Sequence, residues 1–229
     1  MADYQIRKIE ESEYHTSAWS GGMTTELCLS PEEGSYAQRN FLWRLSSATV
    51  DLPESTFTAL PDYERIIMTL EGELDLSHNG GEWLHLKEFM PHRFDGGDLT
   101  VSRGKVTDFN LMLKKGCCTG DMSPLLMKNG ERMETGKDPC PGLQDGFGEH
   151  ILYCHKGQMT VRTEAGETFG LKGGQTLWAF GDFTGAKWVF QAESSVKAVL
   201  VPVKKIMHGG LLCSNDSGEN RKAATRESK

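Results

Sequence analysis

Polar and apolar residues alternate in short stretches along most of the chain, and no segment keeps a helical period over a useful length. Alternation with a period of two is typical of strands that bury one face. Clusters of Gly, Asn, Asp and Pro separate the stretches and mark tight turns, because Gly and Asn tolerate positive φ. The pattern predicts a mainly antiparallel, all-β fold. The predicted strands lie at residues 24–29, 41–50, 65–70, 72–76, 108–113, 151–154, 158–162, 187–191 and 196–203.

The chain also contains an internal repeat. The stretch Arg65-Ile-Ile-Met-Thr-Leu-Glu-Gly72-Glu-Leu-Asp-Leu76 has a counterpart in His150-Ile-Leu-Tyr-Cys-His-Lys-Gly157-Gln-Met-Thr-Val161. The two glycines are 85 residues apart, which is too long for a solenoid repeat and suits a small β-barrel. The repeat therefore predicts two related antiparallel barrels in one chain.

This repeat divides the 229 residues into four parts. Residues 1–115 are predicted to form an N-terminal module that holds the ligand pocket, and residues 116–149 a connector packed between the modules. Residues 150–207 are predicted to form a C-terminal module, completed by strands from the N-terminus or the connector. The polar residues 208–229 are predicted to be a disordered tail.

Charge and composition exclude some classes of protein. A net charge of −7 and a pI near 5.5 argue against nucleic-acid binding. No apolar run approaches the length of a membrane span, and the N-terminus has no apolar leader, so a cytoplasmic protein without membrane contact is expected. The six cysteines are scattered, and in such a compartment they are expected to be free thiols.

Charged residues interrupt the strands of the first half only. Arg44 shares a strand face with Ser46, and Asp108, Asn110 and Met112 share another. The corresponding strand of the second half, residues 196–203, is almost entirely aliphatic. The first module is therefore expected to have a polar interior that holds one small ligand, and the second to be packed shut.

Two other interpretations of these charges stay open. The charged faces could lie in solvent, which is common in antiparallel sheets. The arginines Arg44 and Arg65 could instead form structural ion pairs with Glu26, Asp98 or Asp108. A ligand site is supported by the clustering in one half, since the arginine fork is the natural anchor for a carboxylate.

The same residues carry a family resemblance. From about residue 5 to 205 the chain resembles the HutD/Ves family, whose members are cupin proteins with two RmlC-like jelly-roll modules. The motifs that carry the resemblance are Trp19-Ser-Gly-Gly22-Met-Thr24, Phe41-Leu-Trp43-Arg44-Leu-Ser46-Ser-Ala48, Leu60-Pro61-Asp-Tyr-Glu-Arg65, Leu70-Glu71-Gly72, Phe94-Asp-Gly-Gly-Asp98 and Asp108-Phe109-Asn110-Leu-Met112.

The resemblance implies a small bacterial protein of the cytoplasm. Some members are encoded with histidine-utilisation enzymes and are proposed to bind a metabolite such as formylglutamate or urocanate, and others are linked to stress. The family's pocket lies in the N-terminal cupin. Carried over to this chain, the resemblance implies these ligand-binding residues: Trp19, Thr24, Arg44, Arg65, Asp108, Asn110 and Met112.

Metal and nucleophile chemistry find little support. The chain has no His-x-His motif, and His78, His85 and His92 are spaced so that they are not expected to converge. It has no nucleophile elbow, so no catalytic residue, metal or cofactor is predicted. The preferred function is regulatory binding of a small carboxylate. A cupin isomerase, epimerase or lyase and a protein-interaction scaffold are the alternatives, and a homodimer stays open.

Overall fold

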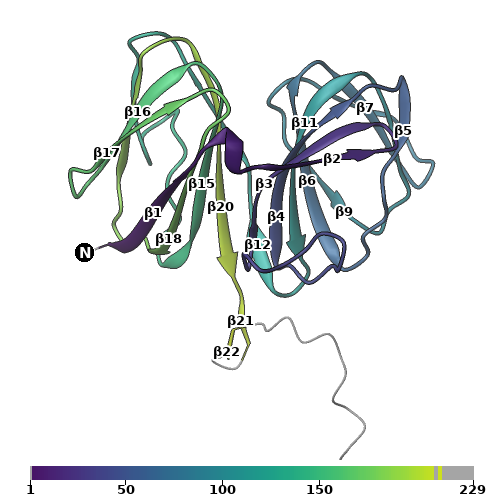
Figure 1. The fold of residues 1–229 in the computed structure, drawn as a ribbon, viewed down its shortest axis with the longest axis horizontal. Helices are drawn as coiled ribbons and strands as arrows, with labels where there is room; N and C mark the ends of the chain where they lie inside the picture. Colours follow the sequence, from purple (N-terminus) through teal and green to yellow (C-terminus); the bar gives the residue numbers. More distant parts are fainter. Residues whose placement is uncertain (1, 209–210, 213–229) are drawn as a thin grey trace, which may run out of the picture.

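The computed structural model describes residues 2–208 and 211–212 and shows two lobes built almost entirely of strands (Figure 1). Within the described residues the one helical element is the short 3-10 helix η1, Glu11–Glu13. The predicted all-β class is confirmed. Every strand predicted from alternation overlaps a strand of the structure.

The N-terminal lobe consists of two antiparallel sheets that face each other. The larger sheet has the order β2-β3-β4-β11-β6-β9, and the smaller has the order β5-β10-β7-β8. The larger sheet contains β2 (His15–Trp19), β3 (Gly22–Ser30), β4 (Trp43–Val50), β11 (Val106–Lys114), β6 (Tyr63–Glu71) and β9 (His92–Asp95). The smaller contains β5 (Glu54–Thr56), β10 (Thr100–Arg103), β7 (Leu74–His78) and β8 (Leu84–Leu86).

The C-terminal lobe repeats this two-sheet arrangement. Its larger sheet has the order β1-β18-β15-β20-β12, with β13 also paired to β20, and its smaller sheet the order β14-β19-β16-β17. The larger sheet contains β1 (Asp3–Ile9), β18 (Thr176–Asp182), β15 (Phe147–Lys156), β20 (Val196–Lys205), β12 (Cys118–Gly120) and β13 (Ser123–Met127). The smaller contains β14 (Arg132–Glu134), β19 (Trp188–Ala192), β16 (Gln158–Thr163) and β17 (Thr168–Lys172).

The strand pairing differs from the predicted closed barrels. Among the described strands, hydrogen bonds join each lobe into two separate sheets and do not close either lobe into a continuous ring. Apolar side chains between the facing sheets hold each lobe together instead. Side-chain alternation reports only which face of a strand is buried, so it could not distinguish facing sheets from a closed barrel.

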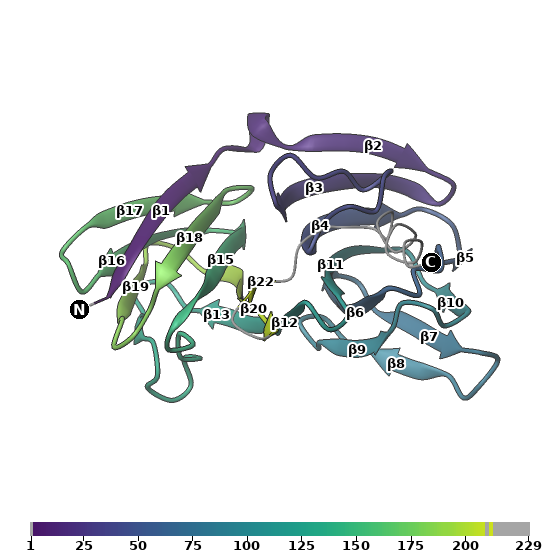
Figure 2. The same cartoon turned by 90° about the horizontal axis from the view of Figure 1, so that it is seen from below.

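Strands from outside residues 150–207 complete the sheets of the C-terminal lobe. β1 pairs with β18, so the first strand of the chain belongs to the C-terminal lobe (Figure 2). The N-terminal lobe begins at β2, after η1. The segment predicted as a connector supplies β12, β13 and β14 to the sheets of the C-terminal lobe. Past β20, β21 (Met207–His208) and β22 (Leu211–Leu212) pair with each other. The rest of the predicted disordered tail lies outside the described residues.

The two larger sheets pack on each other and form one apolar core between the lobes. Alternate residues of β4, β6 and β11, such as Trp43, Ile66 and Phe109, meet Ile151 and Val201 of the other lobe in this core. Glu149 lies buried in it and accepts hydrogen bonds from the indole nitrogens of Trp43 and Trp178, each at 3.0 Å. The lobes are therefore joined by extensive apolar contact and one buried polar cluster.

The interior of the C-terminal lobe is filled by large apolar side chains. Phe183, Trp188 and Phe190 are fully buried between its two sheets, together with Leu152 and Val161. This agrees with the expectation that the second half is packed shut.

The cysteines meet the expectation only in part. Cys28, Cys118, Cys140 and Cys154 are buried free thiols. Cys117, however, is disulfide-bonded, so the expectation of free thiols is wrong at this position. Spacing along the sequence does not report which distant cysteines meet in the fold.

Gly157, one of the two glycines of the repeat, lies at a position that does not accommodate a side chain. Its φ is +92°, and an added Cβ would lie 2.2 Å from the backbone oxygen of Ser195. Gly157→Ala is therefore expected to lower the free energy of unfolding by about 3 kcal/mol or more, because conformational strain and a backbone clash add. Urea unfolding measures the loss. The matched control Gly166→Ala, with φ of +85° and open space around the Cβ, should lose only about 1 kcal/mol.

Candidate functional site

The polar face of the larger N-terminal sheet is ordered in rows across its three central strands. Met112 of β11 pairs with Arg44 of β4 on one side and with Arg65 of β6 on the other. Two residues along β11, Asn110 lies opposite Ser46, and two further on Asp108 lies opposite Ala48. Strand alternation points all of these side chains away from the interlobe core and into the N-terminal lobe.

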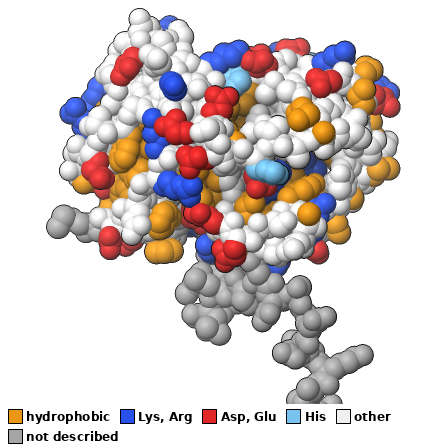
Figure 3. All heavy atoms as spheres, in the orientation of Figure 1, with side chains coloured by type: hydrophobic (Ala, Val, Ile, Leu, Met, Phe, Trp, Pro, Cys, Tyr) orange, Lys and Arg blue, Asp and Glu red, His pale blue; other side chains and the backbone are white. Residues whose placement is uncertain are grey.

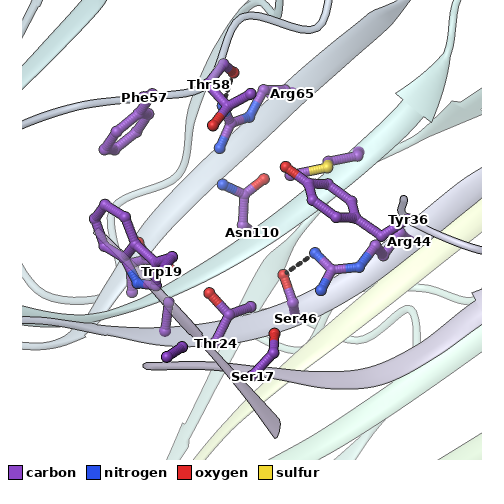
Figure 4. A pocket seen from close by; sticks show the side chains of 14 residues that line it. Ser17, Trp19, Thr24, Tyr36, Arg44, Ser46, Phe57, Thr58, Arg65 and Asn110 are labelled. Atoms are coloured by element: carbon purple, nitrogen blue, oxygen red, sulfur yellow. Dashed lines mark hydrogen bonds between the residues drawn. The ribbon is translucent and has the colours of Figure 1, made fainter. Parts of the chain in front are cut away.

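A cavity of about 200 Å³ lies over this face (Figure 4). Apolar clusters around Ile67 and Phe94 on one side and around Phe41 and Tyr63 on the other fill the adjoining parts of the lobe. The edge strand β2, the loop after β3 and the segment after β5 close over the cavity. Its lining consists of Ser17, Ala18, Trp19, Thr24, Tyr36, Arg44, Ser46, Ala48, Phe57, Thr58, Arg65, Asp108, Asn110 and Met112.

Arg44 is held by partners within the protein. Its Nε donates to Oε2 of Glu26 at 2.6 Å, and its Nη1 donates to Oγ of Ser46 at 3.0 Å. Its guanidinium carbon lies 4.6 Å from the centre of the Tyr36 ring. Of the three acidic partners considered from the sequence, the structure shows Glu26. Because this pair neutralises itself, Arg44 adds little net charge to the cavity.

Arg65 has no comparable partner. The residue is 6% exposed, and within the described part of the chain no carboxylate lies within ion-pair distance of it. Its Nη1 makes a long contact of 3.5 Å with the backbone oxygen of Thr58, and its Nε has no hydrogen-bond partner. The guanidinium instead lies over Phe57 and Phe94, at 5.0 and 5.1 Å from the ring centres. Burial lowers the pKa of Arg65 to about 10, so the group is still cationic at neutral pH.

Asp108 is the cavity's acidic group, and it is 6% exposed. Burial raises the pKa of its carboxyl group to about 7, although Arg65, a backbone hydrogen bond from Ala48 and Arg44 act in the opposite direction. No arginine reaches it closely enough for an ion pair in the described structure. Asp108 therefore does not orient an arginine, and Glu26 does so instead.

The shifted pKa of Asp108 predicts a pH-dependent stability. The ordinary pKa is 3.8, so between about pH 4 and 7 the folded chain retains a proton that the unfolded chain has released. Stability due to this group falls as pH rises through that interval. Asp108→Asn removes the ionisation, and the stability gained by the substitution should grow by about 2–3 kcal/mol between pH 5 and pH 8. Urea unfolding at both pH values measures this, with the exposed Asp51→Asn as control. An equal change in the free energy of unfolding at both pH values would contradict the raised pKa of Asp108.

All seven residues carried over from the resemblance line this one cavity. Solvent exposure of the charged face is excluded, since Arg44, Arg65, Asp108 and Asn110 are all buried. Ser46 and Ala48 are absent from the predicted set, although their alternation with Arg44 is sufficient to find them. The other unpredicted lining residues come from an edge strand and two loops: Ser17, Ala18, Tyr36, Phe57 and Thr58.

The histidines differ from the sequence prediction. His78 and His92 do converge, because the end of β7 meets the start of β9, and their Nε2 atoms lie 3.0 Å apart. Both rings lie beside the ring of Phe94, with ring centres 4.9 and 5.9 Å away, and Phe94 also contacts the guanidinium of Arg65. Burial lowers the pKa of each histidine. His85 lies apart and pairs with Asp75 and Glu73. The described residues contain no group of three or more His, Cys, Asp or Glu side chains placed to hold a metal ion.

No helix within the described residues has the length and hydropathy needed to cross a bilayer. The fold and the cavity define an all-β protein of two lobes with a buried site in its N-terminal lobe that contains two arginines. Comparison with known proteins places this class more narrowly. The chain matches the HutD family over residues 11–201, and it belongs to that family. No curated protein matches the chain.

Solved structures show the same fold. A conserved protein of unknown function from Pseudomonas aeruginosa, PA5104, aligns with a TM-score of 0.73 at 21% identity, over 87% of this chain and 99% of that one. HutD from Pseudomonas fluorescens aligns with a TM-score of 0.65 at 20% identity, over 89% and 100%. The pirin YhhW from Escherichia coli, in complex with nickel(II), aligns with a TM-score of 0.58 at 10% identity, over 86% and 98%.

Proposed function

We propose that this protein binds a small anionic metabolite, a carboxylate, in the cavity of its N-terminal lobe and without a metal ion. The observation that carries the proposal is Arg65. It is a buried guanidinium that lacks a carboxylate partner and has an unsatisfied Nε. An unpaired buried charge is strongly unfavourable, so a site that retains one is best explained by a ligand that supplies the opposite charge.

The rest of the cavity suits a small organic anion. The guanidinium fork can donate two parallel hydrogen bonds to one carboxylate. The side chains of Asn110 and Trp19 each contribute a buried polar atom without a hydrogen-bond partner, Oδ1 and Nε1 respectively. Phe57 and Tyr36 supply aromatic walls (Figure 4). A few polar groups converging within apolar walls are typical of metabolite sites.

Membership of the HutD family leads to a narrower form of the proposal. Formylglutamate and urocanate are the first candidate ligands, and the role would be regulatory, in histidine utilisation or in a stress response, inside the cytoplasm. We further infer that the two lobes are two cupin modules. The repeated glycines support this inference, since each has positive φ and lies in the turn between corresponding strands, Gly72 between β6 and β7 and Gly157 between β15 and β16.

An enzyme is the second candidate, and Asp108 is the observation that favours it. A carboxyl group with a pKa near 7 inside a ligand cavity is suited to general acid–base chemistry, such as an isomerase or lyase requires. The scaffold alternative predicted an apolar, closed interior and a large exposed apolar patch. The cavity contains charged and polar side chains within its apolar walls, and on the face in Figure 3 acidic, basic and apolar side chains are interspersed.

A ligand screen tests the proposal. The full chain is heated with urocanate, formylglutamate, glutamate or histidine, in parallel with a chelator and with added zinc or nickel. A ligand that binds the native state raises the midpoint in proportion to its affinity and concentration. A shift produced by one acid in the presence of chelator is the expected result. A shift that requires metal would overturn the metal-free proposal, and turnover of the bound acid would favour the enzyme.

A further inference from the structure

Asp108 shares the cavity with the cation that is proposed to hold the ligand. Its carboxyl group lines the same space as Arg65, and a single row, which contains Ser46 and Asn110, separates its row from the arginine row. An ionised Asp108 and an anionic ligand would therefore face each other within one small, buried space. Repulsion between like charges is strong there because little water screens it.

The charges around Asp108 can be followed strand by strand. β6 contributes Arg65, β4 contributes Arg44, and β3 contributes Glu26, which is paired with Arg44 at 2.6 Å. The loop after β3 contributes the phenol of Tyr36 to the lining, and Arg39 of the same loop lies behind it, with its guanidinium carbon 3.9 Å from the centre of the Tyr36 ring. Among the groups that line the cavity, with Arg44 paired to Glu26, an ionised Asp108 balances the charge of Arg65, and a protonated Asp108 leaves one excess positive charge. Protonation of Asp108 removes the negative charge that opposes an anion in this space.

We propose that the cavity takes up its anionic ligand together with one proton, which resides on the carboxyl group of Asp108. The inference rests on the proposed function. Asp108 is free to take the proton because, in the described structure, no arginine holds it in an ion pair. Its backbone contact with Ala48 keeps it in place at the cavity wall. Binding and protonation then reinforce each other, since each removes the repulsion that opposes the other.

The ionisation behaviour of the surrounding groups sets the useful pH range. Burial raises the pKa of Asp108 to about 7, so in the free protein the group is largely ionised at pH 8 and largely protonated at pH 6. Burial lowers the pKa of His78 and His92, behind Phe94, so these rings titrate below neutral pH. Burial also lowers the pKa of Arg65, to about 10. Between pH 7 and 9 Asp108 is therefore the cavity group whose change in ionisation is expected to have the largest effect on ligand binding.

Calorimetric titration of the full chain tests the inference. The probe is formylglutamate, whose carboxylates do not titrate between pH 6 and 9. Urocanate serves as a second probe. Each titration is run in two buffers with different ionisation enthalpies, because the difference in heat gives the number of protons taken up. We expect uptake near zero at pH 6, rising toward one at pH 8, and an affinity that falls about tenfold per pH unit above pH 7.

The variant Asp108→Asn separates the outcomes. It should bind with an affinity that does not change between pH 7 and 9 and without proton uptake, while Asp51→Asn should behave like the unsubstituted chain. Binding that needs Arg65 but involves no proton uptake at pH 8 would overturn this inference and leave the proposed function intact. If neither acid binds at any pH, the proposed function is overturned, and this inference with it. The heats of the unsubstituted chain decide the question even if the variant does not fold.

Discussion

Arg65→Met is expected to weaken the binding of an anionic ligand by about 30-fold or more, while making the free protein more stable. Removing one member of a buried, hydrogen-bonded charge pair costs about 2–5 kcal/mol of binding free energy. In the free protein the same guanidinium is a liability, because it is buried with one long hydrogen bond and no carboxylate. Replacing such an ion by an apolar side chain of similar length stabilises by about 1–4 kcal/mol.

Titration calorimetry and urea unfolding at pH 6 measure the two effects on the same variant. At this pH Asp108 is largely protonated, so its loss of a cationic neighbour contributes little. Arg103→Met is the matched control, since Arg103 is exposed and pairs with Glu54 on β5. It should change neither quantity appreciably. A variant that loses stability and retains ligand affinity would show that Arg65 has a structural role and that the site lies elsewhere.

Glu149→Ala is expected to lower the free energy of unfolding by about 3–5 kcal/mol. The carboxylate accepts one hydrogen bond from each of Trp43 and Trp178 and lies 3.3 Å from Nζ of Lys205. Alanine would leave two indole N–H donors buried without an acceptor and would open a space at the interface between the lobes. Urea unfolding, followed by tryptophan fluorescence, measures the loss.

Two further variants define the origin of that effect. Glu149→Gln retains one oxygen acceptor and should lose less than the alanine variant, because one indole remains satisfied. The surface substitution Glu167→Ala should have almost no effect, since that side chain is exposed. A loss below about 1 kcal/mol in Glu149→Ala would mean that this buried cluster contributes little to the contact between the lobes.

The alternation of residues predicted the larger N-terminal sheet well. In β4 and β11 the period of two assigned Arg44 and Asn110 to one face and Trp43 and Phe109 to the other, as found. The sequence could not show whether the polar face met solvent or a cavity. That depends on β2, on the smaller sheet and on a loop that lie over it, and such long-range packing leaves no periodic signal in the strands themselves.

The parts of the site that were missed have a common physical cause. Tyr36 and Phe57 lie outside regular strands, so no periodicity fixes the direction of their side chains. His78 and His92 are 14 residues apart and meet only because β7 and β9 belong to different sheets that approach each other at that point. Tertiary packing decides which strands of two facing sheets approach each other, and residue spacing along the sequence does not report this.

The structure of β11 also decides what can be cut from this protein. One face of the strand lines the cavity. The apolar side chains of its other face, Phe109, Leu111 and Leu113, are buried against the other lobe. Most apolar side chains of β4 and β6 likewise lie in the core between the lobes, whereas Val50 and Ile67 pack within the N-terminal lobe. A fragment ending near residue 115 would expose the apolar face of this sheet to water. It would therefore lose the burial of apolar surface that stabilises the sheet. The N-terminal lobe is thus not expected to fold on its own, and a sensor or fusion built from it would have to include the C-terminal lobe as well.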